Sequence, residues 1–219
     1  MKTKRNFIIS ISFLLAFVVW TVLVKFVDVQ SIGPMNSSVG FATLNGAFRS
    51  LVGSRLGLYT VTDWLSIIPL VFVLGFAVLG IAQLIARKSL KKVDYDLFVL
   101  GGFYIVVFAL YVVFEFVVIN HRPVLLGGVL EVSYPSSTTL LVLTVIPTAY
   151  MQLNARIKNQ KAKNFISILL EAFLIFMVLG RIISGVHWIT DIIGGALLSV
   201  GLVMAYKGFI SLKKTKGNK

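Results

Sequence analysis

Long, almost uncharged runs dominate this sequence, and they restrict the possible folds more than any other feature. Six of them approach or exceed the roughly 20 residues that an α-helix needs to cross the hydrocarbon layer of a bilayer. The runs are residues 7–27, 64–86, 97–118, 137–155, 165–180 and 188–206. Because a chain within lipid must satisfy its own backbone polar groups, each run predicts a transmembrane helix.

The composition agrees with a membrane protein. Of 219 residues, 58% are hydrophobic and only 13% are charged, and the mean hydropathy is +0.93, far above the usual range for a soluble domain. Nearly every residue belongs to one of the runs or to a short connection. We therefore expect an all-α fold, a six-span transmembrane bundle that forms one membrane-embedded domain over residues 1–219.

The basic residues predict the orientation, because Lys and Arg collect on the cytoplasmic side of membrane proteins. Most of the 21 Lys and Arg residues lie near the termini or in two alternate connections. They are Lys2, Lys4 and Arg5; Arg87, Lys88, Lys91 and Lys92; Arg156, Lys158, Lys161 and Lys163; and Lys207, Lys213, Lys214, Lys216 and Lys219. This pattern predicts a multi-pass protein of the cell membrane with both termini in the cytoplasm.

The net charge of +13 does not indicate a nucleic-acid partner. The basic residues are spread over four short segments next to the membrane, and no folded basic face carries them. Anionic lipid explains them better. The chain has no cysteine, which excludes disulfides and thiolate metal sites. The first run lacks a small-residue cleavage pattern, so we interpret it as a retained span.

The largest outer segment, residues 28–63, contains a helical pattern. Apolar residues recur in it at three- and four-residue spacing: Phe41, Leu44, Phe48, Leu51 and Val52. This pattern is typical of an amphipathic helix that lies along the outer membrane interface. A lid packed on the bundle would show the same pattern, and the sequence alone favours neither interpretation.

Polar residues concentrate between the last two runs, where the chain reads GRIISGVHWITDIIGG from Gly180 to Gly195. Unpaired polar groups beside lipid are costly, so residues of this kind suggest a function. His187 and Asp191 are four residues apart, so a helix that begins near Val186 would let the carboxylate orient the imidazole. A turn at Ser184 would bring Arg181 close to both. The alternative is a structural hydrogen-bonded pair.

Two further polar groups fall on the same predicted outer side. One is Arg122, which is followed by a proline, and the other is the start of the fourth run at Pro135, with Ser136, Ser137 and Thr138. A helix start offers free backbone N–H groups that favour anions. Arginine can hold two phosphate oxygens at once, and an oriented imidazole can act as a nucleophile towards phosphorus. These groups together predict a phosphate site.

These motifs resemble those of the type 2 phosphatidic acid phosphatase family, whose superfamily includes the vanadium haloperoxidases. The family pattern is K-x6-R-P, then P-S-G-H or P-S-S-H, then S-R-x5-H-x3-D, and the third part is present here at the family spacing. The resemblance implies that His187 is the nucleophile and Asp191 its orienting partner. It also implies phosphate binding by Arg122, Arg181 and the start of the fourth span at Ser136 and Ser137, with no metal or other cofactor.

Three positions depart from the family pattern. Glu115 stands where the family has lysine, Gly180 stands where it has serine, and Thr138 stands where it has the histidine that protonates the leaving group. Loss of a general acid typically costs about 10²–10⁴-fold in rate. His121 or Glu131 in the outer loop are possible substitute acids.

A leaving group that needs no proton would remove the requirement for a general acid. A lipid diphosphate expels a lipid monophosphate, whose second pKa is about 6. The expected activity is therefore that of a lipid phosphatase acting at the outer leaflet through a phosphohistidine. A prenyl diphosphate such as undecaprenyl diphosphate is favoured over phosphatidic acid. The alternative is a catalytically impaired homologue that binds or translocates lipid phosphates.

Overall fold

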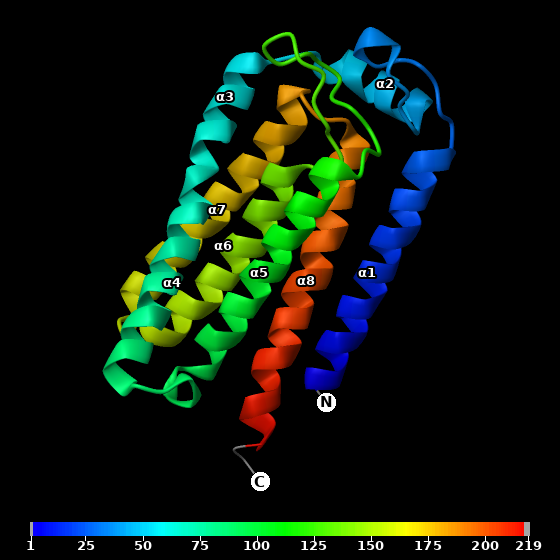
Figure 1. Ribbon diagram of the computed structural model, residues 1–219. Helices are drawn as coiled ribbons and strands as arrows, with labels where there is room; N and C mark the ends of the chain where they lie inside the picture. The colour runs from blue at the N-terminus through cyan, green and yellow to red at the C-terminus, as the bar shows by residue number, and fades with distance from the viewer. Residues whose placement is uncertain (1, 217–219) are drawn as a thin grey trace.

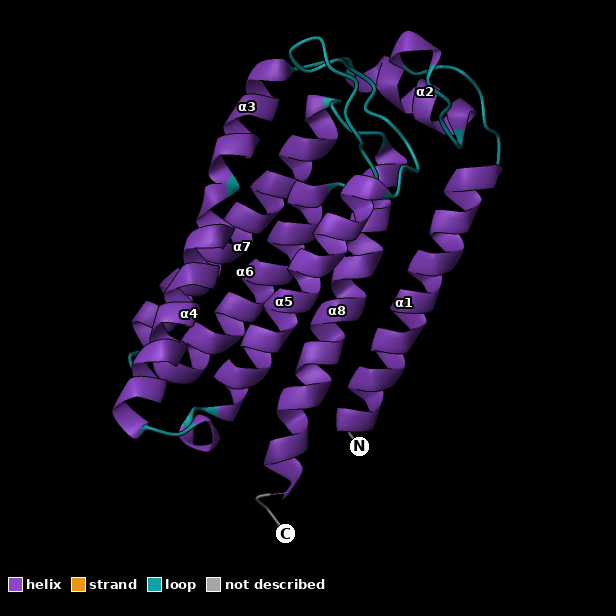
Figure 2. Cartoon of the chain, in the orientation of Figure 1, coloured by secondary structure: helices purple, strands orange, loops and turns teal. Residues whose placement is uncertain are grey.

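Eight α-helices make up most of the described chain, which comprises residues 2–216 of a computed structural model. The helices run side by side as a bundle, with α2 lying across one end (Figure 1). They are α1 (Lys2–Phe26), α2 (Ala42–Val52), α3 (Leu56–Leu65), α4 (Ile67–Arg87), α5 (Tyr95–Phe116), α6 (Ser137–Arg156), α7 (Gln160–Ser184) and α8 (Ile189–Lys216). The all-α prediction is confirmed for these residues (Figure 2). Residues 1 and 217–219 of the predicted domain lie outside the described part.

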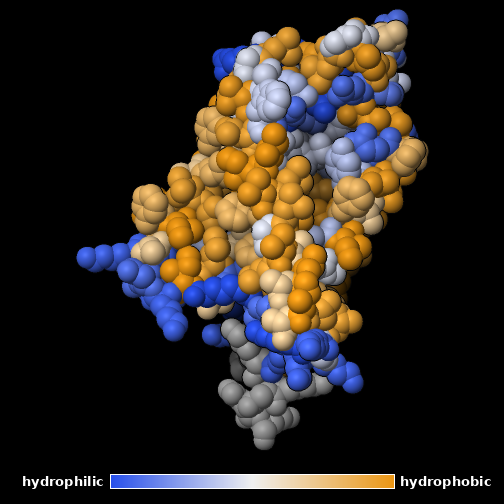
Figure 3. Space-filling view, turned by 60° about the vertical axis from the view of Figure 1, so that its left-hand side comes forward, coloured by the Kyte–Doolittle hydropathy of each residue, from blue (hydrophilic) through white to orange (hydrophobic). Residues whose placement is uncertain are grey.

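Five stretches within residues 2–216 are long and apolar enough to cross a membrane. They are α1, the nearly continuous α3 and α4, α5, α7, and α8 up to Lys213. Apolar side chains cover the middle of the molecule, polar side chains gather towards its lower end, and polar and apolar side chains are mixed at its upper end (Figure 3). The predicted count of six spans depends on α6, so that count stays a prediction.

Helix α6 is less apolar than these five stretches, and it lies inside the bundle, in contact with α4, α5, α7 and α8. The hydroxyl groups of two of its buried threonines donate to backbone carbonyls of the same helix. Thr144 donates to the carbonyl of Leu140 at 2.7 Å, and Thr148 donates to the carbonyl of Thr144 at 2.8 Å. A helix surrounded by other helices therefore carries polar residues without an unsatisfied donor.

Both described ends of the chain lie at the same end of the bundle (Figure 1). Ion pairs join three helices there: Arg87 contacts Asp94 at 2.8 Å, and Arg156 contacts Asp96 at 3.2 Å. The polar stretch between α7 and α8 lies at the opposite end. The bundle thus has a basic end and a second polar end, which we call the site end.

Helix α2 packs on the turn between α7 and α8. The Nδ2 atom of Asn45 donates to Thr190 Oγ1 at 3.0 Å, and Arg49 Nη1 donates to the carbonyl of Gly185 at 2.7 Å. These contacts are those of a lid on the bundle. Whether the apolar side of α2 also meets a membrane interface stays a prediction.

Tyr134 anchors the loop that enters α6. Its ring is 1% exposed, stacks with Phe17 at a centroid distance of 6.2 Å, and shares a hydrogen bond of 2.7 Å with Thr21. The same ring lies over Gly194 of α8, where an added Cβ would come within 2.6 Å of it. Close approach of α8 to this ring therefore requires glycine at position 194.

We expect Gly194→Ala to destabilise the protein by about 1–3 kcal/mol, because overpacking forces a fixed ring to move. Gly102→Ala in α5 is the matched control, since a Cβ there meets nothing within 4 Å. It should be neutral, or stabilising by up to about 1 kcal/mol. The measurement is thermal unfolding in detergent, and equal effects of the two substitutions would contradict this packing.

Candidate functional site

His187 occupies the turn between α7 and α8 and is buried. Gly185 ends α7 in the left-handed region, with φ of 61°, and an added Cβ would lie 1.9 Å from the carbonyl oxygen of Gly53. Only glycine accommodates both the backbone angle and the close neighbour. This turn directs the chain into the site end, where His187 meets residues from two other segments.

The imidazole of His187 contacts a guanidinium on one side and a hydroxyl on the other. Its Nε2 atom accepts a hydrogen bond of 2.9 Å from Nη1 of Arg122, and its Nδ1 atom lies 3.2 Å from Oγ of Ser133. The expected partner Asp191 is 3.8 Å from Nδ1, beyond hydrogen-bonding distance. The two residues do not pair within one helix, because α8 begins only at Ile189.

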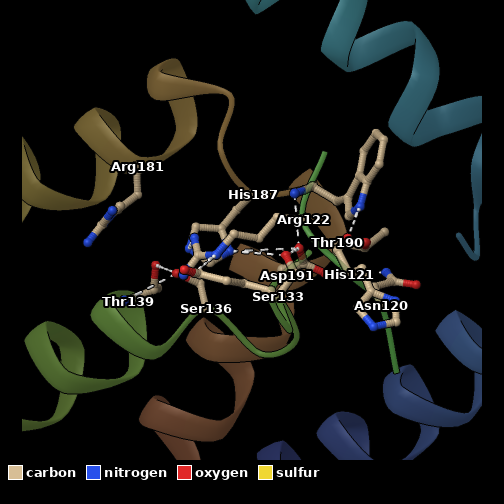
Figure 4. A network of polar contacts seen from close by, with 12 residues as sticks. Asn120, His121, Arg122, Ser133, Ser136, Thr139, Arg181, His187, Thr190 and Asp191 are labelled. Atoms are coloured by element: carbon tan, nitrogen blue, oxygen red, sulfur yellow. Dashed lines mark hydrogen bonds and ion pairs between the residues drawn. The ribbon is translucent and has the colours of Figure 1, made fainter. Parts of the chain in front are cut away.

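Asp191 is fully buried and caps α8. Its Oδ2 atom accepts from the backbone N–H of Trp188 at 2.9 Å and from the hydroxyl of Ser133, while Oδ1 accepts from Asn120 at 3.3 Å. An acidic side chain in the first turn also suits the helix dipole. Asp191 thus joins the helix start to two loop segments (Figure 4).

Arg122 lies on an extended segment that pairs with the chain around Glu131. Its backbone N–H donates to the Glu131 carbonyl at 3.0 Å, and its Nε donates to the Glu131 carboxylate at 3.0 Å. Neighbouring side chains of an extended segment point in opposite directions. His121 is therefore directed away from His187, and its contribution is a carbonyl that accepts from Trp188 Nε1 at 2.7 Å.

Arg181 is 1% exposed and stands apart from the network around His187 (Figure 4). Its Nη2 donates to Asp63 at 2.8 Å and to the hydroxyl of Thr138. Its Nε and Nη1 are buried without a hydrogen-bond partner. Such groups are costly inside a protein, so they mark a place suited to an anion.

A single aromatic ring connects the two arginines. The guanidinium carbon of Arg181 lies 4.8 Å from the centre of the Tyr59 ring, and that of Arg122 lies 5.7 Å from the same centre. Cations are stabilised over aromatic faces at such distances. The structure therefore brings the two predicted phosphate ligands to one ring on α3.

The sequence predicts that three residues at the start of α6 bind phosphate, and the structure gives them different surroundings. Ser136 is the N-cap, and its backbone N–H donates to the Asp191 carbonyl at 3.1 Å, so this group is not free to bind a ligand. Ser137 lines the cavity beside His187. The N–H groups of Ser137 and Thr138 belong to the first turn and have no acceptor within the helix. They are the donors that could hold an anion.

Two cavities meet at this helix start. The smaller one, about 20 Å³, holds roughly one water molecule and is lined by Arg122, Ser133, His187 and Glu115 among others. The larger one, about 420 Å³, is mainly apolar and extends between α4, α5 and α6. They share Tyr111, Ser137 and Leu140. A polar chamber thus adjoins an apolar one.

Burial lowers the pKa of His187 from its usual value to about 4, and the nearby Arg122 acts in the same direction. The carboxylate of Asp191 opposes the shift without cancelling it. His187 is therefore neutral at pH 7 and keeps a lone pair on the nitrogen that faces Arg122. A neutral imidazole is the form that can attack an electrophile.

The sequence did not point to Ser133, Asn120, Tyr59 or Asp63. Ser133 and Asn120 lie in loops, and the two α3 residues are far from the motifs in sequence. Within residues 2–216, no group of three or more His, Asp or Glu side chains is arranged to hold a metal ion.

The fold resembles that of a known membrane phosphatase. No family model and no curated protein matches the sequence. Among solved structures, the chain is similar to the first transmembrane PAP2 type phosphatidylglycerolphosphate phosphatase from Bacillus subtilis, with a TM-score of 0.59 and 19% identity over 92% of this chain and 96% of that one. At this identity the similarity establishes the fold alone. Together with the apolar helices, it defines a multi-pass membrane protein.

We expect His187 to titrate near pH 4, well below the ordinary histidine value of about 6.5. The measurement is an NMR titration of histidine-labelled protein in detergent. The chain has only two histidines, so His121→Gln assigns the signals. A His187 midpoint at the ordinary value would contradict the closed, buried site.

Proposed function

We propose that this protein is an integral-membrane phosphatase that removes phosphate from lipid phosphates or diphosphates through a phosphohistidine on His187. One observation carries the proposal: the unprotonated Nε2 of His187 faces Arg122, and a second arginine over the same tyrosine ring has two buried nitrogens without partners. A phosphoryl group between the arginines would satisfy these nitrogens and present phosphorus to Nε2.

The neighbouring apolar cavity supports a lipid as the substrate. Most of its wall consists of apolar side chains of α4, α5 and α6, and its polar lining residues include Asp63, Ser137 and Thr138. A lipid bound with its phosphate at Ser137 and Thr138 would place a hydrocarbon chain against the apolar wall. A soluble phosphate ester would leave that surface uncovered.

The reaction has two steps. In the first, Nε2 of His187 bonds to the terminal phosphorus while the bond from that phosphorus to the leaving oxygen breaks. This oxygen is the ester oxygen of a monophosphate or the bridging oxygen of a diphosphate, and the lipid alcohol or lipid monophosphate leaves with the bonding electron pair. In the second, water attacks phosphorus, the bond to Nε2 breaks, and orthophosphate leaves. Charge neutralisation by Arg122 and Arg181 lowers both barriers, as in other phosphoryl transfers, and no step calls for a metal.

Substrate binding requires the arginines to exchange partners. In the closed site, Glu131 binds Arg122 and Asp63 binds Arg181, and the chamber holds about one water molecule. A phosphate dianion competes with these carboxylates for the same guanidinium groups. Both carboxylates are partly exposed, so they can turn towards solvent when phosphate binds.

The leaving group favours a diphosphate. Thr138 stands in the position of the family histidine and accepts a hydrogen bond from Arg181. Glu131 is the ion-pair partner of Arg122, a role in which its carboxylate accepts. A lipid diphosphate releases a monophosphate that needs no proton, whereas a monoester must release an alkoxide. We therefore propose a prenyl diphosphate as the preferred substrate class.

The proposed orientation has six spans, with the site end at the outer face and both termini in the cytoplasm. The basic connections α4–α5 and α6–α7 lie at the end of the bundle opposite to the turn between α7 and α8 (Figure 1). The positive-inside rule assigns such connections to the cytoplasm. The polar chamber then opens near the outer leaflet of the cell membrane.

We expect the purified protein to release phosphate from a prenyl diphosphate faster than from phosphatidic acid or phosphatidylglycerol phosphate. His187→Asn should reduce release by about 10³-fold or more, because loss of a nucleophile removes the covalent route. Binding of a labelled lipid phosphate by wild type, with no release from any of the three lipids, would reject hydrolysis in favour of a binder or translocator.

Thr138→His should raise hydrolysis of phosphatidic acid, by up to about 10²-fold, because it supplies an acid for the leaving oxygen. Hydrolysis of the diphosphate should change little. The measurement is the ratio of the two rates in the variant and in wild type. An equal change on both substrates would contradict the proposed reason for diphosphate preference.

A further inference from the structure

Ser133 lies between His187 and Asp191, the two residues that the sequence motif predicts to interact directly. The imidazole Nδ1 of His187 and the Oδ2 atom of Asp191 are 3.8 Å apart, too far for a direct hydrogen bond. Ser133 Oγ lies 3.2 Å from Nδ1 and donates to Oδ2. Ser133 is only 3% exposed, so bulk water does not compete for these contacts.

The donors and acceptors allow one arrangement of protons. A carboxylate only accepts, so the single hydroxyl hydrogen of Ser133 is used on Asp191. Towards His187 the serine oxygen can then only accept, which requires the hydrogen of the imidazole to be on Nδ1. Independently, Arg122 only donates, so Nε2 of His187 must carry the lone pair. Both ends of the ring specify the same tautomer.

We infer that Ser133 is a positioning residue that links Asp191 to His187 and holds the imidazole with its lone pair on Nε2, towards the phosphate. The kinetic part of this inference rests on the proposed phosphatase function. When Nε2 bonds to phosphorus, the ring becomes positive, and its Nδ1–H continues to donate to Ser133. The negative Asp191 carboxylate polarises the Ser133 hydroxyl, and the serine oxygen in turn stabilises the positive ring. No proton is transferred.

The position of Ser133 depends on its neighbours. Its backbone N–H donates to the carbonyl of Asn120 at 3.0 Å, and the anchored Tyr134 ring follows directly in the chain. Asp191 receives two further hydrogen bonds, from Trp188 and Asn120, which hold its carboxylate in place. The relay is therefore fixed at both ends, as an orienting group must be.

Nitrogen-15 NMR of histidine-labelled protein tests the tautomer without any need for activity. In wild type, we expect His187 to carry its hydrogen on Nδ1. In Ser133→Ala, the Nδ1–H loses its acceptor, so we expect a shift towards the form with hydrogen on Nε2. Ser133→Thr keeps the hydroxyl and should restore the wild-type spectrum.

The kinetic test uses phosphate release from a prenyl diphosphate. We expect Ser133→Ala to lower kcat by about 10–100-fold, by analogy with the loss of groups that orient metal-binding histidines, and Ser133→Thr to recover most of the loss. Ser199→Ala is the matched control, since Ser199 is also fully buried but its hydroxyl donates to the Gly195 carbonyl at 2.6 Å and the Leu140 carbonyl at 3.4 Å, and not to His187 or Asp191. It should leave kcat unchanged.

The outcomes separate this inference from the proposed function. Hydrogen on Nε2 in wild type, or a tautomer and kcat that do not respond to Ser133→Ala, would overturn the relay even in an active phosphatase. The predicted tautomer change in a protein that releases no phosphate would support the relay and reject hydrolysis. Equal losses in Ser133→Ala and Ser199→Ala would show a general packing effect and also overturn it.

Discussion

The buried carboxylate of Asp191 holds the site end together. It caps α8 through the Trp188 N–H, accepts from Asn120 near the end of α5, and accepts from Ser133 in the loop before α6. The backbone carbonyl of the same residue accepts from Ser136. A charge without solvent is tolerable only when several donors surround it. The start of α8, the loop before α6 and the start of α6 are therefore all anchored to Asp191.

Two arginines at the site end are candidates for binding an anion. Arg122 and Arg181 lie over one tyrosine ring, and each is neutralised by a carboxylate that is partly open to solvent. Under the proposed function, an incoming phosphate would replace these carboxylates with an anion of greater charge. The adjoining apolar cavity adds a second recognition element for a hydrocarbon chain. Both features support the lipid phosphate that we propose as the substrate.

The lengths of the apolar runs predicted where helices form, because a segment that spans a bilayer can adopt few structures other than a helix. They did not predict the break at Ser66 between α3 and α4, or the extension of α8 to Lys216, since polar residues near a membrane surface continue a helix as readily as they end it. The topology derived from hydrophobic length and basic residues predicted that Arg122, Arg181, His187 and Asp191 lie on one side of the membrane, and the structure brings them to one end of the bundle. That topology could not predict Ser133 or Asp63, whose positions depend on tertiary packing and not on any local periodicity.

The central claim is that His187 becomes phosphorylated, and trapping this intermediate tests it most directly. A prenyl diphosphate labelled in its terminal phosphate is mixed with the protein and quenched in alkali within milliseconds. We expect a labelled protein that is stable in alkali, loses its label in acid, and is absent in His187→Asn. Phosphate release by wild type with no labelled protein, or labelling that persists in His187→Asn, would contradict the account.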